Sequence, residues 1–533
     1  MLFCHSIKSV SPSQENAIFI PIRAWMLILV VVMVYGLTAE AINAQDGASV
    51  ATPPSITTIP SDGFNLKVVE QPTPYYIITT LDPPVFNWFA GTFTNLPTDK
   101  EVTIGLNMNG MDQNINKANV SKWAQLKTVM TYADPTQYAT YEWFQKDEHG
   151  RWVSGDPLKQ GKAKYAGTGV LPEQHVIPKE VAEQFLSGDG NYWQAWREVD
   201  QTVAVESLNI FRIKQRFALP QASIAMRVPY TYTYLQQFLA GLEQAKYPDV
   251  CIDVIGETPE KRKLQAIRLS RAPDTTDLAA RQTVLLVGRE HANEAYSSWM
   301  VHNVIAAWLT SREDPTFEPA TDWILIPIQD PDGSAHGNYN RQTNLFDPEK
   351  KELAAEALAY ANYFIDYVNG GRSLDLCITL HNVEAGECPN IFCPVLSPLP
   401  YELEPETKLN TAVFTNLKEH GLLTGDPMTC WEKLLVQSRL TIWCNRRFGG
   451  LPVGYEVNDR YPERRLNLRQ AMEMGALFVQ SVDAWENSED GRQWHARIRK
   501  VVQRRALERK SYFELHRLTP NERTTYEILI KGF

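Results

Sequence analysis

The chain has 533 residues, of which 44% are hydrophobic and 21% are charged, and its formal net charge is −10. That length exceeds what one hydrophobic core usually organises, so it predicts two domains with additional segments. The net negative charge, without a sizeable basic domain to offset it, argues against nucleic acid as a general partner.

The first residues predict a segment outside the fold. Residues 24–37 form an apolar run (AWMLILVVVMVYGL) that follows Arg23 and precedes a small-x-small sequence, AEA. This is the order of a secretory signal peptide, and the run is shorter than the roughly 20 residues that span a bilayer as a helix. We therefore predict a signal peptide at residues 1–44 and a secreted or periplasmic protein without stable membrane insertion. Left uncleaved, the segment would be a membrane anchor.

Two segments of different composition follow. Residues 45–62 are rich in Thr, Ser and Pro and lack periodicity, which predicts a linker. Residues 63–226 carry short alternating or apolar runs, such as YYIITTL and EVTIGLNMNG, with turn residues between most of them. This pattern predicts an antiparallel β-sandwich domain. Packing between two sheets explains the aromatic residues of this domain better than a ligand groove does.

The pattern changes at residues 227–488, where helical patterns alternate with nearly continuous apolar strands. The strands are residues 283–288, 323–328 and 374–380. Apolar strands between helices are typical of a mostly parallel sheet that helices cover on both faces, so we predict an α/β domain. Residues 489–533 are basic with helical periodicity and predict a solvated helical extension docked on the surface.

Polar residues follow each of these strands. His291 and Glu294 come after the first strand, Asp330 begins the sequence DPDG after the second, and His381-Asn382 follow the third. Functional residues of such sheets gather at the edge where the carboxyl ends of the strands meet. The sequence thus predicts a polar cluster at that edge.

Three of these residues have the chemistry of a zinc site. His291, Glu294 and His381 offer two imidazoles and one carboxylate, which leave a fourth position for water that the metal acidifies. Taken alone, His-x-x-Glu is common on solvated helices, and a histidine at a strand end is more often a core residue. Together, they predict one zinc ion per chain.

A hydrolytic site also needs a base and positive charge. Glu456 lies in an apolar, strand-like context after a Gly-rich turn, which makes it the candidate base; the structural alternative is a salt bridge to Arg446 or Arg447. Arg289 and Arg341 are the candidate cations, because arginine can hold a carboxylate through two parallel hydrogen bonds. Serine chemistry has less support, because Gly-x-Ser-x-Gly is absent.

At these residues the chain resembles the zinc metallocarboxypeptidase family, most nearly its cytosolic carboxypeptidase (deglutamylase-type) branch. The resemblance covers roughly residues 64–483 and depends on ordered spacing rather than on any single motif. Its motifs are His291-Ala-Asn-Glu294, Asp330-Pro-Asp-Gly333, His381-Asn382, Glu456 and the junction sequence Pro229-Tyr-Thr-Tyr232.

The resemblance implies a mixed, eight-stranded α/β catalytic domain after the β-sandwich, with one zinc bound by His291, Glu294 and His381. Glu456 would be the general base and later the proton donor to the leaving amine. An arginine would bind the terminal carboxylate of the substrate. The expected function is that of a zinc-dependent metallocarboxypeptidase, with peptide or protein C-termini as substrates.

The chain departs from the family pattern in one informative place. The family usually has Asn-Pro-Asp-Gly, then a first arginine, then Asp-Leu-Asn-Arg. This chain has Asp330-Pro-Asp-Gly and then only Asn340-Arg341, with no second arginine close behind. We favour Asn340 and Arg341 as the carboxylate-binding pair, with the arginine that stabilises the oxyanion supplied elsewhere. Alternatively, Arg341 stabilises the oxyanion and the carboxylate site is lost.

Two other functions remain open at this point. A zinc amidase or deacylase on the same scaffold would fit the missing second arginine. A binding protein with a decayed metal site would fit the sandwich, although the complete ligand set and Glu456 argue against it.

Overall fold

The computed structural model describes most of the predicted α/β domain and part of the chain before it. The described residues belong to one compact unit that comprises residues 53–533. They are residues 89–107, 128–132, 197–205, 210–271, 281–311, 321–336, 354–382, 400–423, 440–457, 468–498 and 500, and the backbone of short strands at 55–57, 66–70, 75–80, 143–146, 152–155, 192–194 and 392–395. The predicted leader lies outside them.

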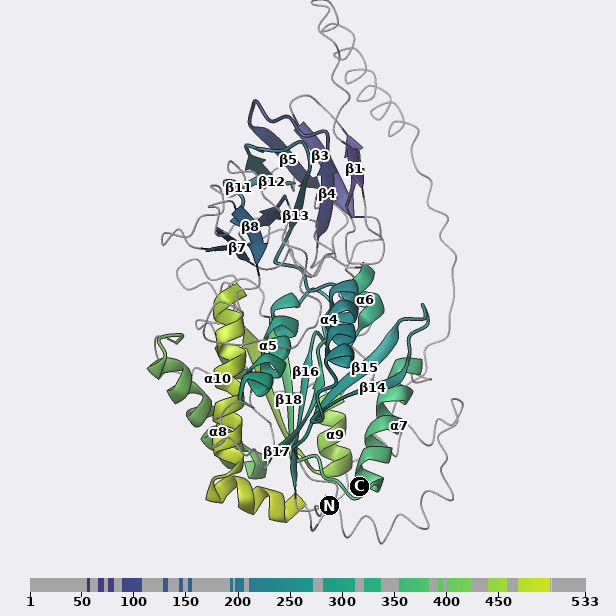
Figure 1. The fold of residues 1–533 in the computed structure, drawn as a ribbon, viewed down its shortest axis with the longest axis vertical. Coiled ribbons are helices and arrows are strands. Elements are labelled where there is room, and N and C mark those ends of the chain that lie inside the picture. Colours follow the sequence, from purple (N-terminus) through teal and green to yellow (C-terminus); the bar gives the residue numbers. More distant parts are fainter. Residues whose placement is uncertain are drawn as a thin grey trace, which may run out of the picture. The chain divides into compact units, whose positions relative to one another are not determined.

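The N-terminal part of this unit is made of strands (Figure 1). One five-stranded sheet has the order β1 (Ser55–Thr57), β4 (Ala90–Thr94), β13 (Ala222–Ala225), β6 (Val129–Thr131), β10 (Arg197–Glu198). A second has the order β11 (Gln201–Val205), β12 (Ile210–Gln215), β5 (Val102–Asn107), β3 (Tyr75–Thr80), β2 (Leu66–Glu70). A three-stranded sheet contains β8 (Trp152–Gly155), β7 (Trp143–Lys146) and β9 (Tyr192–Gln194).

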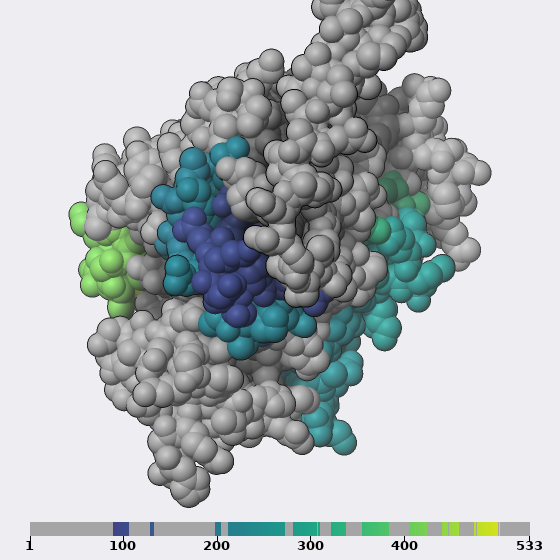
Figure 2. All heavy atoms as spheres, turned by 90° about the horizontal axis from the view of Figure 1, so that it is seen from above, coloured from purple at the N-terminus to yellow at the C-terminus, as the bar shows by residue number. Residues whose placement is uncertain are grey.

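These sheets differ from the sequence-based expectation in two details. Strand β1 lies inside the segment predicted as a linker, because its backbone pairs with β4 and needs little apolar surface of its own. Strands β3 and β5 pair in parallel, whereas the other pairs of these sheets are antiparallel. Figure 2 shows residues near 90–107 and near 200–225 gathered on one face, in agreement with the pairing of β4 with β13. The β-sandwich itself stays a prediction.

The α/β domain is built on a mixed sheet, as expected. Its described strands have the order β14 (Val250–Glu257), β15 (Lys263–Leu269), β17 (Thr321–Ile326), β16 (Gln282–Gly288), β18 (Leu376–Asn382), β20 (Leu451–Val457), β19 (Phe392–Val395). The four strands β17, β16, β18 and β20 are parallel, and the outer three are antiparallel to their neighbours. Seven strands thus lie among the described residues, where the family resemblance implied eight.

Helices cover both faces of this sheet (Figure 1). They are α4 (Tyr232–Ala245), α5 (Ala295–Ser311), α8 (Pro400–Glu419) and α10 (Leu468–Glu486) on one face, and α7 (Ala355–Asn369) and α9 (Leu440–Phe448) on the other. Side chains of a strand alternate between faces, so Val284 and Leu286 join the first core while Leu285 and Val287 join the second. Because both faces are covered, β16 is buried along its whole length.

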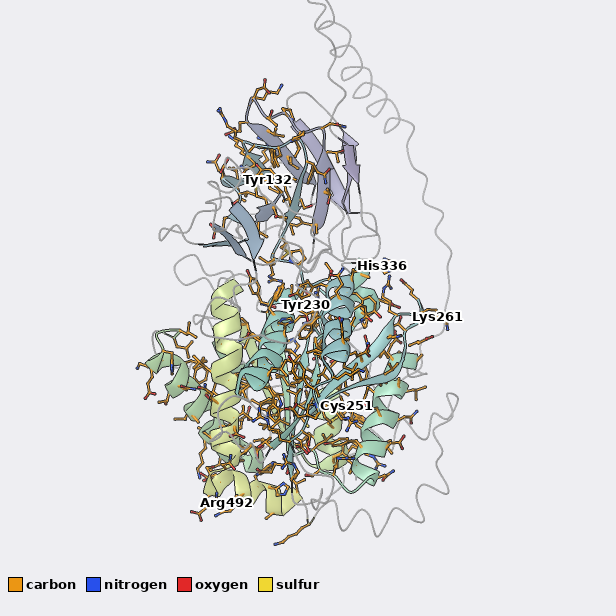
Figure 3. The ribbon with its side chains drawn as sticks, in the orientation of Figure 1. Tyr132, Tyr230, Cys251, Lys261, His336 and Arg492 are labelled. Carbon is orange, nitrogen blue, oxygen red and sulfur yellow. The ribbon has the colours of Figure 1, made fainter. Side chains whose placement is uncertain are left out.

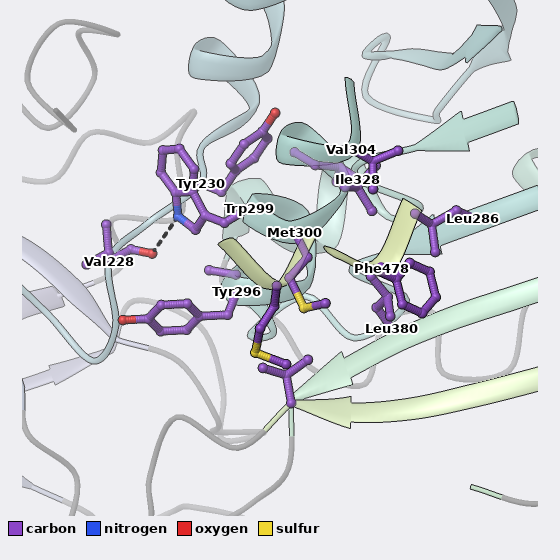
Figure 4. Close-up of a cluster of buried hydrophobic side chains, with 14 of the residues drawn as sticks. Val228, Tyr230, Leu286, Tyr296, Trp299, Met300, Val304, Ile328, Leu380 and Phe478 are labelled. Carbon is purple, nitrogen blue, oxygen red and sulfur yellow. Dashed lines mark hydrogen bonds between the residues drawn. The ribbon is translucent and has the colours of Figure 1, made fainter. Parts of the chain in front are cut away.

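The first core also contains the junction that leads into this domain. Figure 4 shows Val228 and Tyr230 packed with Tyr296, Trp299 and Met300 of α5. The indole N–H of Trp299 donates to the carbonyl of Val228 at 3.4 Å. Two T-shaped ring contacts at 4.9 Å join Tyr230 to Tyr234 of α4 and to Trp299. The junction is therefore anchored to the helix that follows the predicted metal-binding turn.

The C-terminal segment is helical at residues 489–498. Trp494 and Ile498 belong to the first core, so this part of the predicted extension is packed rather than merely solvated. The indole N–H of Trp494 donates to the carbonyl of Asp375 at 3.0 Å. Among the described residues, no helix is both long enough and apolar enough to span a bilayer.

Candidate metal site

The turn that carries two of the predicted ligands is short and tightly packed. Strand β16 ends at Gly288, where a Cβ atom would meet the carbonyl of Ser297 at 3.1 Å and that of Pro327 at 3.2 Å. Arg289 then adopts φ 55°, which reverses the chain at some energetic cost. The hydroxyl of Ser297 accepts a hydrogen bond from the Arg289 N–H at 2.8 Å and donates to the Glu294 carbonyl at 2.6 Å. The turn is thereby fastened to the start of α5.

Two buried arginines hold the main chain of this turn. Arg289, 2% exposed, donates from Nε to the carbonyl of Ala292 at 2.8 Å and from Nη1 to the carbonyl of Tyr230. Arg227, also 2% exposed, donates from Nη1 to the carbonyl of Asn293 at 2.8 Å. The junction at residues 226–231 and the turn therefore share hydrogen bonds to charged groups, which are stronger than neutral ones.

This geometry corrects one expectation from the sequence. Arg289 was expected to be a cation that binds substrate, but its guanidinium is buried and directed to main-chain carbonyls. The sequence could not reveal this, because the positive φ of Arg289 and the proximity of the junction are tertiary features.

The three predicted ligands come together. His291 Nδ1 lies 2.7 Å from Glu294 Oε1, His381 Nδ1 lies 3.0 Å from Glu294 Oε2, and the two Nδ1 atoms are 3.3 Å apart. Their ligand atoms all lie within 4.8 Å of one another, and they are the one such group of His, Cys, Asp or Glu found in the described part of the chain. The side chains are nearly buried, with His291 the most exposed at 13%.

The spacing of these atoms fits a small divalent cation. Ligand atoms about 2.0–2.2 Å from a tetrahedral zinc ion are about 3.3–3.6 Å from one another. The separations given above, 2.7–3.3 Å, reach the lower end of that range, and shifts of a few tenths of an ångström would open the cluster to such an ion. Burial alone would raise the pKa of Glu294, but the charges and hydrogen bonds of His291 and His381 outweigh it and hold the pKa below its ordinary value. Glu294 is thus an anion, as a carboxyl group that binds a metal must be.

The outer nitrogen of His381 has partners that the sequence did not point to. His381 Nε2 lies 3.1 Å from Thr379 Oγ1 and 3.3 Å from Glu290 Oε2, and the Thr379 hydroxyl donates to the same carboxylate oxygen at 3.3 Å. Glu290 is 3% exposed. Its place between a buried strand and the first predicted ligand was the available signal, since a charge there requires a partner.

Glu456 occupies the strand next to His381. Strands β18 and β20 are parallel neighbours, and His381 and Glu456 are partners in their register. Register partners have side chains on the same face of a sheet, and adjacent strands are about 4.8 Å apart. Glu456 is partly exposed, while its neighbours Tyr455 and Val457 are buried in the first core on the other face. Strand β18 extends two residues beyond the predicted end, so His381 lies within it.

Asn382 connects the elements around the site. Its Oδ1 accepts from the Ser297 N–H at 3.2 Å, and its Nδ2 donates to the carbonyl of Val457 at 3.3 Å. The end of β18 is thus tied to the start of α5 and to the end of β20. This explains in structural terms why Asn382 follows His381 in the motif.

The DPDG sequence, residues 330–333, is hydrogen-bonded to the loop between β14 and β15. It opens the short helix α6 (Pro331–His336), where Asp330 Oδ1 accepts from the Gly333 N–H at 2.7 Å. Asp332, fully buried, accepts from the Thr258 hydroxyl at 2.6 Å and from Arg262 Nη1 at 2.7 Å. The sequence therefore links α6 to the loop between β14 and β15.

The same loop contacts the end of α6. His336, the last residue of that helix, lies 2.7 Å from Glu260 Oε1, and Figure 3 shows His336 on α6 and Lys261 in the loop. The chain then continues towards Asn340 and Arg341, which lie outside the described residues. Their assignment as substrate-binding residues stays a prediction.

Comparison with known proteins identifies the domain. Residues 235–354 match the family described as zinc carboxypeptidase. Cytosolic carboxypeptidase 6 of Caenorhabditis elegans is 33% identical over 114 residues, which are 21% of this chain and 24% of that protein. The chain therefore contains a zinc carboxypeptidase domain and spans about a quarter of that relative's length.

Solved structures resemble this one in fold. A metallo-carboxypeptidase from Burkholderia cenocepacia matches with a TM-score of 0.55 and 18% identity, over 81% of this chain and 99% of that one. A putative carboxypeptidase A from Shewanella denitrificans matches with a TM-score of 0.56 and 14% identity, over 80% and 98% of the two chains. The similarity extends well beyond residues 235–354 and confirms the carboxypeptidase-like α/β fold.

The comparisons overturn the predicted location. The curated relatives that the chain matches are cytosolic carboxypeptidases, so the expectation of a secreted or periplasmic protein with a signal peptide was wrong. That expectation depended on the hydropathy and flanking charge of residues 24–37. Those properties describe an apolar segment, and they do not by themselves determine export.

Proposed function

We propose that this protein is a zinc-dependent metallocarboxypeptidase that hydrolyses the C-terminal peptide bond of peptides or proteins. The observation that carries the proposal is the convergence of His291, Glu294 and His381 beside Glu456, in a chain that contains a zinc carboxypeptidase domain. The family match supports zinc chemistry, and the geometry supports the assignment of residues.

His291, Glu294 and His381 would hold one zinc ion. When bound, such an ion polarises the carbonyl of the scissile bond and makes water a nucleophile near neutral pH. The work of the chain is to keep two neutral imidazoles and one anionic carboxylate directed at one point. The low pKa of Glu294 and the hydrogen bonds to the turn serve that purpose.

Glu456 is the proposed general base. Its position opposite His381, on the same face of the sheet, brings a carboxylate to the ligand cluster. A carboxylate there can take a proton from the attacking water and later give it to the leaving amine. Its partial exposure makes the carboxylate accessible to solvent.

Binding of the terminal carboxylate is assigned to Arg341 with Asn340. Arginine suits this role because its planar guanidinium binds a carboxylate through two hydrogen bonds. We do not assign Arg289 to carboxylate binding, because its guanidinium is buried and donates to the main-chain carbonyls of Ala292 and Tyr230.

The test is Glu456→Gln, compared with wild type for zinc content and for hydrolysis of a set of peptides. General bases contribute about 10²–10⁴-fold, so the variant should lose at least a hundredfold in kcat while it retains one zinc per chain. Glu406→Gln, a buried carboxyl on α8, is the matched control and should leave kcat unchanged. Full activity of Glu456→Gln would remove this residue from the mechanism.

One observation favours a second candidate, a zinc amidase or deacylase on the same scaffold. No arginine occurs between Arg341 and Arg372, and Arg289 is engaged with the main chain. Paired peptides with free and amidated C-termini discriminate between the two functions. A carboxypeptidase cleaves only the free form, whereas equal cleavage of both forms would indicate the amidase.

A further inference from the structure

Glu290 is a buried carboxylate that the proposed reaction does not use. It lies between Arg289 and His291 at the end of β16, and it is 3% exposed. Burial of a charged carboxylate is costly unless hydrogen bonds compensate for it. The identity of those partners therefore shows what the residue does.

The partners lie on the neighbouring strand β18. Oε2 of Glu290 is 3.3 Å from His381 Nε2 and accepts a hydrogen bond from the Thr379 hydroxyl, also at 3.3 Å. Thr379 Oγ1 is itself 3.1 Å from His381 Nε2. Three polar atoms thus form a closed triangle on the side of the imidazole that faces away from Glu294.

This triangle offers two acceptors to a hydrogen on Nε2 of His381 when Nδ1 binds a metal ion. The Thr379 hydroxyl can donate its single hydrogen to the carboxylate at 3.3 Å, and its oxygen can then accept from Nε2 at 3.1 Å. Both oxygens near Nε2 are then acceptors, and they favour the tautomer with hydrogen on Nε2. Nδ1 lies on the other side of the ring, 3.0 Å from Glu294 Oε2 and 3.3 Å from His291 Nδ1, so in this tautomer its lone pair is available to a cation held where the ligand atoms converge.

We propose that Glu290, together with Thr379, is a positioning residue for His381: it fixes the metal-binding tautomer and the orientation of the imidazole. This inference rests on the proposed function, because it assumes that His381 binds zinc. Carboxylates that accept from the outer nitrogen of a metal-binding histidine typically strengthen metal affinity by about 10–100-fold.

The experiment compares Glu290→Gln, Thr379→Val and wild type. The dissociation constant for zinc is measured by competition with a chelator, and the proton on His381 Nε2 is observed by ¹⁵N-edited NMR of the zinc-loaded protein. Glu290→Gln should bind zinc about 10–100-fold more weakly, and Thr379→Val should show a smaller loss. Glu406→Gln is the matched control and should bind zinc as wild type does.

The outcomes separate this inference from the proposed function. Wild-type protein that binds no stoichiometric zinc would overturn the proposed function. Wild-type protein that binds zinc with the proton on Nδ1 of His381, or a Glu290→Gln variant with unchanged affinity, would overturn the role of Glu290. If Glu290→Gln does not fold, the Thr379→Val variant provides the test. An unchanged zinc affinity and an unchanged Nε2 proton signal in that variant would contradict the proposal.

Discussion

Ionisable groups are buried at both ends of the parallel strands in the central sheet: at the carboxyl ends, called here the first edge, and at the amino ends, called the second edge. The pKa of a buried glutamate is shifted down at the first edge and up at the second. At the carboxyl ends of the parallel strands, two imidazoles surround Glu294 and lower its pKa. At the other edge, burial raises the pKa of Glu486 well above its ordinary value, and the charges of Asp375 and Asp483 raise it further.

The geometry explains this difference. At the first edge, two imidazoles and one carboxylate converge within the reach of one cation. At the second edge, Asp375 accepts from the Thr283 N–H at 2.8 Å, from the Ser373 hydroxyl at 2.6 Å and from His495 Nδ1. Neither carboxylate oxygen of Glu486 has a hydrogen-bond partner among the described residues. A cluster of buried ionisable groups is therefore a candidate metal site only when its ligand atoms converge on one point. The groups at the second edge do not, and we assign them a structural role.

The largest expected effect comes from removal of a predicted metal ligand at the first edge. His381→Ala removes a ligand and leaves Glu290, Glu294 and His291 without their shared partner, so zinc binding should weaken by at least a thousandfold and hydrolysis should be lost. Metal analysis after dialysis, with activity on the same sample, measures both quantities. Substitution of His495 by Ala at the second edge should leave both unchanged; loss of zinc in that variant instead would reverse the comparison.

The second prediction concerns pH and the second edge. Because the folded-state pKa of Glu486 is raised, the native protein keeps a proton that the unfolded chain loses above the ordinary value of 4.5. Stability should therefore fall as pH rises above 4.5, by up to about 1.4 kcal/mol per pH unit for this group.

Glu486→Gln should remove that contribution. Urea unfolding of wild type and variant between pH 4.5 and 8 measures it, and the advantage of the variant should grow as pH rises. A constant difference between the two proteins across this range would show that Glu486 titrates normally.

A smaller effect is expected from a substitution in the junction at residues 226–231, which is hydrogen-bonded to the turn at the first edge. Arg227→Met removes the donor to the Asn293 carbonyl and should reduce the free energy of unfolding by about 2 kcal/mol, since hydrogen bonds to charged groups contribute about 1.5–3 kcal/mol. It should also weaken zinc binding, because the turn that carries His291 and Glu294 loses its hydrogen bond to Arg227. Arg281→Met, which breaks the ion pair with Asp322 near the second edge, should reduce stability without any change in zinc affinity.

Sequence patterns were sufficient for the parts of the site that depend on spacing. His291 and Glu294 follow the buried strand β16, His381 lies near the carboxyl end of β18, and parallel strands place their carboxyl ends together. The mixed sheet and its helices followed from the alternation of apolar runs with helical patterns. Strand ends differed by two residues at β17 and β18, because ladder pairing rather than hydropathy determines where a strand stops.

The remaining features depend on tertiary contacts that have no sequence period. Glu290 and Thr379 act through His381, so neither belongs to a motif. Arg227 and Arg289 are ordinary basic residues in the sequence, and only the packing of the junction against the turn gives them their role. The predicted export failed for a related reason, since hydropathy alone does not specify a destination.

The most direct measurement of the central claim is a crystal structure of the zinc-loaded protein, with anomalous scattering recorded at the zinc edge. The account predicts one zinc ion per chain, bound by Nδ1 of His291, a carboxylate oxygen of Glu294 and Nδ1 of His381, with Glu456 on the adjoining strand. A zinc ion bound elsewhere, or these three side chains directed apart with no metal between them, would contradict it.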